Sequence, residues 1–174
     1  MYAAPVPVAP SSPRADLKVE LNEGRHVLAT WRNVLLQGFA SEARIGTLKR
    51  SSEILRRLAS THPEGVGFMI IVSHSGRPPE HECRSEWVAQ MSAASTRVVL
   101  VLFEGQSFRA SLVRGVVTGL VMLARPTACV LTAEKASEGV PRFTAEMAKR
   151  KASCGTASEL EAALLATKQL LAPP

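Results

Sequence analysis

The sequence predicts an α/β fold in which helices cover a β-sheet. Three short segments, at residues 67–73, 98–103 and 128–132, are rich in β-branched residues and carry no charge. The stretches between them place apolar residues at helical spacing. Buried strands that alternate with amphipathic helices are typical of a sheet covered by helices. The order of elements therefore predicts the fold class before any functional residue is considered.

A chain of 174 residues has the length of one domain with tails. Hydrophobic residues make up 46% and aromatic residues only 5%, so aliphatic side chains must fill the core. No apolar run approaches the roughly 20 residues that a membrane-spanning helix needs. The N-terminus lacks the basic start and compact apolar region of a signal peptide. We therefore expect a cytoplasmic protein without a membrane span. The three cysteines are unevenly spaced, which argues against a disulfide framework.

The formal net charge of +6 raises the question of a nucleic-acid partner. The basic residues are spread along the chain, and few aromatic side chains stand between them for base stacking. This pattern favours a solvated basic surface. We expect no nucleic-acid partner.

The N-terminal part of the chain predicts an arm followed by a hairpin. Residues 1–15 hold repeated prolines and are expected to form a disordered or polyproline arm. Residues 17–21 alternate apolar and polar side chains, a turn-forming stretch follows, and residues 26–31 read as a second strand. Residues 34–39 either extend that strand or form a separate short one.

Three helices are expected, one before the central strands and two between them. Ser41 can cap the first, which ends at residues 62–65. The second carries Cys83 in an apolar stripe, and the third begins at a Ser107 cap and runs to about residue 125. The outer face of the first helix is basic, with Lys49, Arg50, Arg56 and Arg57.

The domain is expected to cover residues 16–140. The sequence then becomes polar, so residues 141–157 predict a linker, with room for a short helix around residues 143–151. Ser158 and Glu161 form a capping-box pair before a leucine stripe, which predicts an amphipathic helix over residues 158–172. Its leucines must be buried either on this domain or on another molecule.

The order of elements resembles the STAS fold of the anti-sigma-factor antagonists and of the related small STAS/SEC14-like (SpoIIAA-like) bacterial domains. The likeness covers roughly residues 17–140. It rests on element order and on the strand at 98–103 with the phrase Glu104-Gly105-Gln106-Ser107-Phe108-Arg109 behind it. The resemblance implies a mixed sheet of four to five strands with helices packed on one side. It also implies a non-enzymatic regulatory or scaffolding function through protein–protein interaction.

In such domains the loop after the third strand is the point of partner binding and phosphorylation. Here that loop is Ser73-His74-Ser75-Gly76. Ser75-Gly76 matches the last two positions of the family's Asp-Ser-Ser-Gly-like phrase, while the acidic residue is absent and Arg77 departs from the family's apolar continuation. The resemblance makes Ser75 the candidate phosphoacceptor, with Arg77 near the added phosphate.

The candidate contact surface joins this loop to the exposed faces of the second and third helices. Gly105 before the Ser107 cap could bind an anion through free backbone N–H groups, or it could belong to an ordinary turn. Glu86 is the candidate on the second helix. The partner- or anion-binding candidates are Ser73, His74, Arg77, Gly105, Ser107, Arg109 and Arg114.

Small residues recur every four positions on the third expected helix. A glycine inside a helix costs about 1 kcal/mol relative to alanine, so these residues should allow another backbone to approach. We favour tight packing within the chain over self-association, which is the other interpretation. The self-association candidates are Ser111, Gly115 and Gly119 on this helix and Leu160, Leu164 and Leu171 on the C-terminal one.

Other chemistries find little support in the sequence. His74, His81 and Cys83 carry metal-ligating atoms but match no common zinc spacing and lack a fourth ligand. No Gly-x-Ser-x-Gly elbow and no Walker loop is present. We therefore expect no metal, no cofactor and no enzymatic activity; an enzyme would need a pocket that gathers His74, Glu104 and Arg109. The alternative function is a small-ligand or lipid carrier.

Overall fold

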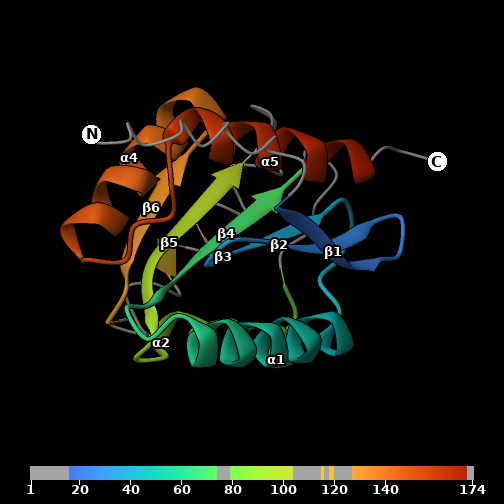
Figure 1. The fold of residues 1–174 in the computed structure, drawn as a ribbon. Coiled ribbons are helices and arrows are strands. Elements are labelled where there is room, and N and C mark those ends of the chain that lie inside the picture. Colours follow the sequence, from blue (N-terminus) through green and yellow to red (C-terminus); the bar gives the residue numbers. More distant parts are fainter. Residues whose placement is uncertain (1–15, 74–78, 104–114, 116–117, 120–126, 172–174) are drawn as a thin grey trace, which may run out of the picture.

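The computed structural model describes residues 16–73, 79–103, 115, 118–119 and 127–171, and it has an α/β fold (Figure 1). The sheet has six strands in the order β1-β2-β3-β4-β5-β6, rather than the four to five expected. The first three strands pair antiparallel and the last four pair parallel, so the sheet is mixed. The strands are β1 (Leu17–Asn22), β2 (His26–Trp31), β3 (Val34–Phe39), β4 (Val66–Val72), β5 (Thr96–Phe103) and β6 (Cys129–Ala133).

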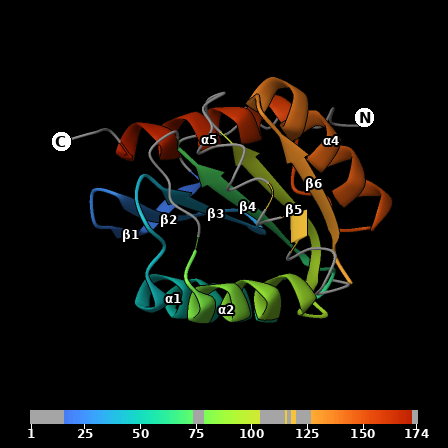
Figure 2. The ribbon, with the colours of Figure 1, turned by 180° about the vertical axis from the view of Figure 1, so that it is seen from behind.

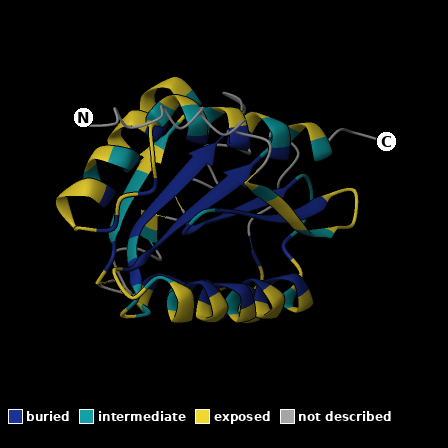
Figure 3. Ribbon diagram, viewed as in Figure 1, coloured by how far each residue is buried: buried dark blue, intermediate teal, exposed yellow. Residues whose placement is uncertain are grey.

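Helices cover both faces of the sheet, which corrects the expectation that they pack on one side. Helices α1 (Ile45–Thr61) and α2 (His81–Ser92) lie on one face, and α4 (Ala136–Lys149) and α5 (Ala157–Leu170) lie on the other (Figures 1 and 2). The reason is visible in the strands themselves. Every residue of β2, β3 and β4 is buried, so both faces of these strands require a covering layer (Figure 3).

The N-terminal strands form a meander with two tight turns. Gly24 (φ +69°) lies in the β1–β2 turn, as expected for a hairpin, and Arg32 (φ +51°) lies between β2 and β3, so β3 is a separate strand. The register of β1 shifts between Val19 and Leu21. A bulge of this kind changes the face to which later side chains point. Leu21 therefore packs into the core under α1 and α2, whereas Leu17 packs into the core under α4 and α5.

The parallel strands follow each other in the sheet because a helix crosses over between them. Strand β3 leads through α1 to β4, and β4 leads through α2 to β5. Parallel neighbours need such crossovers, and crossovers of one hand place successive helices on the same face. This connection places the starts of α1 and α2 beside each other at the carboxyl edge of the sheet.

Residues 141–149 of the expected polar linker belong to α4, which packs directly on the sheet. Phe143 and Met147 are fully buried, and a Cβ atom on Gly67 of β4 would lie 2.5 Å from Cζ of Phe143. The polar residues that suggested a linker occupy the outer face of this helix. α4 is thus part of the domain.

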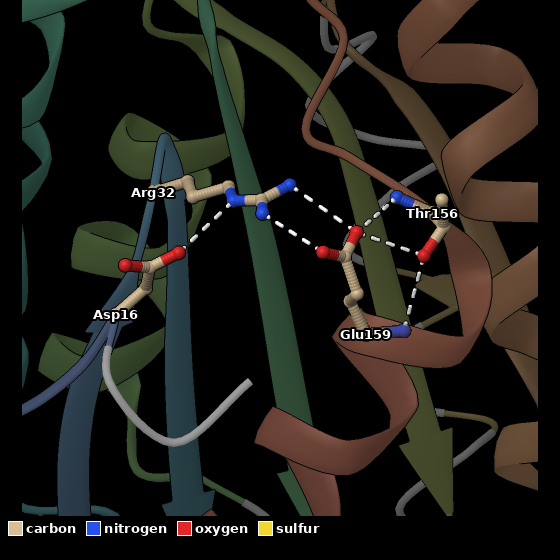
Figure 4. A network of polar contacts seen from close by, with 4 residues as sticks. All are labelled: Asp16, Arg32, Thr156 and Glu159. Atoms are coloured by element: carbon tan, nitrogen blue, oxygen red, sulfur yellow. Dashed lines mark hydrogen bonds and ion pairs between the residues drawn. The ribbon is translucent and has the colours of Figure 1, made fainter. Parts of the chain in front are cut away.

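The C-terminal helix is anchored at its start by a charged network (Figure 4). The capping box uses Thr156 and Glu159, not the expected Ser158 and Glu161. Arg32 holds Glu159 in a two-pronged ion pair, with Nη2–Oε1 at 3.0 Å and Nη1–Oε2 at 3.4 Å, and its Nε lies 3.4 Å from Asp16. This network ties the first turn of α5 to the β2–β3 turn.

Candidate functional site

The carboxyl ends of the parallel strands meet at one edge of the sheet, where open α/β sheets commonly bind ligands. Ser73 follows β4 at this edge; it is half-buried, and its backbone N–H donates to the carbonyl of Phe39 at 2.9 Å. Of the other residues predicted for this loop and for the third helix, His74, Ser75, Arg77, Gly105, Ser107, Arg109, Ser111 and Arg114 lie outside the described residues.

A buried histidine lies beneath the same edge. His26 begins β2, opposite the last residue of β3, and is only 1% exposed. Its Nε2 lies 2.8 Å from the carbonyl oxygen of Glu42 and 3.2 Å from Oγ of Ser41, and its Nδ1 lies 3.5 Å from Oγ1 of Thr47. Burial lowers the pKa of His26, and the nearby Arg44 charge acts in the same direction. The imidazole is therefore neutral at pH 7.

His26 is not placed to activate Ser41 as a nucleophile. The carbonyl of Glu42 can only accept a hydrogen bond, so Nε2 carries the ring proton. Ser41 faces this same protonated nitrogen. A general base needs a free lone pair directed at the nucleophile, and here the lone pair is on Nδ1, toward Thr47. The histidine instead joins the β3–α1 loop to β2.

We expect the free energy of unfolding to fall as the pH drops below about 6.5. The unfolded chain protonates His26 near its ordinary pKa of 6.5, whereas burial holds the folded-state pKa lower. The contribution of His26 to the free energy of unfolding is therefore full above pH 6.5. As the pH falls from there to the folded-state pKa, this contribution decreases by at most about 1.4 kcal/mol per pH unit. Urea unfolding at several pH values measures this slope.

His26→Gln should flatten that profile between about pH 7 and pH 5, because it removes the titrating group. His62→Gln makes the same substitution at a part-exposed histidine and is the comparison variant. A wild-type profile that is already flat over this range, or an unchanged slope in His26→Gln, would contradict the prediction.

Acidic residues gather where α1 and α2 begin. A hydrogen bond with Glu42 and the negative charge of that residue raise the pKa of Glu80, and the charge of Glu82 adds to the effect. Cys83 in the next turn is 3% exposed, as expected for a core residue, with Sγ 3.3 Å from the carbonyl of Ala43. Burial raises the pKa of the Cys83 thiol, which stays protonated. Among the described residues, no group of three or more His, Cys, Asp or Glu could hold a metal ion.

The first turn of α1 borders a surface cavity. The N-cap is Arg44 rather than the expected Ser41, no side chain caps the helix, and the first turn holds no acidic residue. Arg44 lies 3.9 Å from Glu23 in the β1–β2 turn. Free backbone N–H groups at a helix start give this end a positive character. The cavity has a volume of about 350 Å³ and is lined by Leu21, Glu23, Arg44, Gly46, Thr47 and Arg50.

The positive character continues along the exposed side of α1. Glu53 is the only acidic residue of this helix, and it pairs with Arg50 at 2.8 Å. Arg57 pairs with a glutamate of β1 at 2.5 Å. Lys49 and Arg56 are exposed and form no ion pair within the described part of the chain. We call the set Arg44, Lys49, Arg50, Arg56 and Arg57 the α1 basic face.

A buried polar layer lies between α1, α2 and β3. Ser51 donates to Oε1 of Gln37 at 3.1 Å. Gln90 donates from Nε2 to the carbonyl of Leu48 at 2.8 Å and to Oγ of Ser52 at 2.9 Å. The hydroxyl of Ser52 also donates to Glu86. The partner candidate Glu86 is therefore half-buried and already bonded between the two helices.

Three polar atoms of this layer have no hydrogen-bond partner among the described residues: Nε2 of Gln37, Nε1 of Trp87 and Oε1 of Gln90. All three side chains are at most 3% exposed. A buried polar atom without a partner costs about 1–3 kcal/mol. Two N–H donors and one carbonyl acceptor of this layer thus lack a partner in the described part of the chain.

The structure separates the self-association candidates into two groups. Leu160 and Leu164 are fully buried, and Leu171 is 8% exposed, all in the core under α4 and α5. They cannot meet a second molecule unless α5 leaves the sheet. Gly115 and Gly119 are helical, and a Cβ atom on either would meet no described residue within 4 Å. The residues beside both glycines lie outside the described part of the chain, so tight packing there stays a prediction.

Sequence patterns did not reveal His26 or the cavity beside α1. The three residues around His26 and the six that line the cavity come together only when the β1–β2 hairpin packs on α1. A histidine at the start of an apolar strand was the one available signal. The outer basic residues of α1, by contrast, follow from helical spacing.

No protein-family model, no curated protein and no solved structure matches this chain significantly. The resemblance to STAS-like domains thus stays a prediction from the order of elements. None of the described helices is long and apolar enough to cross a membrane. The functional inference depends on the surfaces and contacts of the chain itself.

Proposed function

We propose that this protein is a non-enzymatic regulatory or scaffolding domain of the cytoplasm, STAS-like in its order of elements, that docks an acidic surface of another protein on the α1 basic face. One observation carries the proposal: five cationic side chains lie along the start and outer side of α1 with Glu53 as the only acidic residue of the helix. Lys49 and Arg56 have no ion-pair partner within the described residues and are available to a partner.

Electrostatics decides what such a face can contribute. A single exposed ion pair is worth about 0.2–1 kcal/mol and is weakened by salt. Several like charges on one rigid helix add up, and they also accelerate the encounter with an oppositely charged surface. α1 is held rigidly, since Leu48, Ile54, Leu55 and Leu58 are buried against the sheet. We therefore expect salt-sensitive binding.

The non-enzymatic part of the proposal is supported by the polar groups at the carboxyl edge. His26 is neutral with its Nε2 proton directed at a carbonyl, and Cys83 is a protonated, buried thiol. Both side chains are used to join elements of the fold. Neither offers a base or nucleophile to a substrate.

A small-ligand carrier is the second candidate function. It is favoured by the three unpartnered polar atoms of Gln37, Trp87 and Gln90 in the layer between α1, α2 and β3. Two N–H donors and one acceptor in this buried polar layer match a small molecule with a carbonyl and a hydroxyl or amide group. The basic face is the stronger basis, because its side chains are exposed without any movement of the helices.

Reversing two charges of the α1 basic face tests the first proposal. Lys49→Glu/Arg56→Glu should weaken binding of a labelled glutamate-rich peptide about tenfold or more, or roughly 1.4 kcal/mol. The control Arg150→Glu/Lys151→Glu makes the same change in net charge at the exposed end of α4 and should bind nearly as well as the wild type. Fluorescence anisotropy at low and at physiological salt measures both.

Two further probes separate the acidic-protein proposal from its competitors. A short duplex DNA and vesicles rich in phosphatidylserine are titrated in the same assay. Equal loss in both double variants would show that net charge alone acts and would overturn the proposal. Tighter binding of DNA or vesicles than of the peptide, lost in Lys49→Glu/Arg56→Glu, would assign the face to a nucleic acid or a membrane instead.

A further inference from the structure

The two outer strands of the sheet differ in how their free edges are protected. Strand β1 carries Lys18 and Glu20, and its register shifts at Val19. Charges and a bulge on an edge strand are the usual devices that prevent pairing with another chain. Strand β6 has neither, since its sequence CVLTA is uncharged and its pairing with β5 is regular over five residues.

Strand β6 also exposes apolar side chains on both faces of the sheet. Within the described part of the chain, only β5 pairs with it. Val130 packs partly into the core under α1 and α2, whereas Cys129, Leu131 and Ala133 pack partly into the core under α4 and α5. All four are half-buried, and Thr132 is exposed. An uncharged, half-exposed edge is a template for a further strand.

We propose that β6 is a self-association edge, at which two copies of this chain pair antiparallel and join their sheets into one. A twofold axis through Leu131 places Val130 opposite Thr132 and Cys129 opposite Ala133. The charged residues that follow β6 then avoid like-charge contacts, because Lys135 lies opposite Thr127 and not opposite its own copy. Such self-complementary contacts are the rule in twofold dimers.

The side chain of Arg142 contacts the outer edge of β6 only weakly. Nη1 of Arg142 lies 3.4 Å from the carbonyl oxygen of Thr132, which is long for a hydrogen bond. An exposed arginine can swing away at little cost, and a strand N–H would then take its place. The carbonyl of Thr132 is therefore available to a second copy.

Two glycines that precede β6 support self-association independently of the edge. Gly115 and Gly119 are helical, and no atom of the described residues lies within 4 Å of the position of a Cβ on either. Each costs about 1 kcal/mol relative to alanine, and no close contact with the described part of the chain offsets that cost. A neighbouring molecule could approach closely at both positions. This proposal does not rest on the α1 basic face.

The test compares the two edges of the sheet in the full chain. Size-exclusion chromatography with light scattering should show a dimer that dissociates on dilution. Thr132→Lys places a charge at an exposed position of β6 and should shift the midpoint of this transition to at least tenfold higher concentration. Val19→Lys makes the matched change on β1, where Val19 is 45% exposed, and should leave the midpoint unchanged.

Hydrogen exchange of the wild-type chain keeps the test decisive if Thr132→Lys fails to fold. The amides of residues 129–133 should exchange more slowly at concentrations where the dimer forms. A chain that stays monomeric at every concentration overturns the proposal. So does a dimer whose β6 amides are no better protected than in the monomer, or one that both lysine variants weaken equally.

Discussion

A chain that ends at Gly155 should lose its cooperative fold, because α5 covers the face of β2 and β3 that no other described helix covers. Leu160 and Leu164 are fully buried, and Trp31 and Leu36 beneath them are fully buried too. Burial of one large aliphatic side chain contributes about 1.5–3 kcal/mol. The loss on both sides of this interface is comparable with the whole stability of a domain, about 5–15 kcal/mol.

Circular dichroism melts and binding of a hydrophobic dye measure this effect. We expect the truncated chain to show no sharp transition and to bind the dye strongly, whereas a chain that ends at residue 171 should behave as the full chain. A truncated chain that remains folded would mean that α5 is dispensable. The helix would then be an appendage, as the sequence allowed.

Neighbouring leucines of α5 provide a matched pair of point variants for the same interface. Leu164 is fully buried, and Leu165 is 57% exposed. Leu164→Ala should lower the free energy of unfolding by about 2–5 kcal/mol, and Leu165→Ala should change it by no more than about 0.5 kcal/mol. Equal effects would place α5 differently from its position on β2 and β3.

Phe143→Ala should destabilise the protein by about 3–5 kcal/mol, because it empties a fully buried position between α4 and the sheet. The size of this effect matters since the sequence assigned residue 143 to a polar linker. Ser137→Ala, at an exposed position of the same helix, is the control and should be nearly neutral. Chemical unfolding measures both. A change under about 1 kcal/mol for Phe143→Ala would show that residues 141–149 do not pack on the sheet and form a linker instead.

A double-mutant cycle tests whether α4 and β4 touch at the observed point. Gly67→Ala should cost about 1–3 kcal/mol, because its Cβ would lie 2.5 Å from Cζ of Phe143. Phe143→Ala removes that atom, so the double variant should lose less stability than the sum of the two single variants. Strict additivity would show that the two residues are not in contact.

Only the part of the candidate site that lies on one helix, the basic outer side of α1, could be predicted from the sequence. Helical spacing placed Lys49, Arg50, Arg56 and Arg57 on the outer side of α1, and the structure leaves them exposed there. His26 contacts residues that lie 15 to 21 positions away in the sequence, and the spacing of apolar residues does not predict contacts of this kind. The predicted loop residues from His74 to Arg77 lie outside the described part of the chain.

The sequence by itself determined the local elements. Apolar runs of Val, Ile and Leu defined β4 and β5, and turn-forming residues defined the β1–β2 hairpin, because strand and turn preferences act over a few neighbours. The α/β class followed from their alternation with helices. These predictions needed no knowledge of how the elements pack.

Only the tertiary structure decided which face each helix covers and where the domain ends. Continuous apolar runs such as that of β4 are typical of strands buried on both faces, but they do not identify the covering helices, so nothing local placed α4 and α5 on the second face. The capping box likewise shifted by two residues, because Arg32 of the β2–β3 turn, far away in the sequence, holds Glu159. The face that each helix covers, the end of the domain and the position of the capping box all depend on contacts between residues far apart in the sequence. Neighbouring residues do not reveal such contacts.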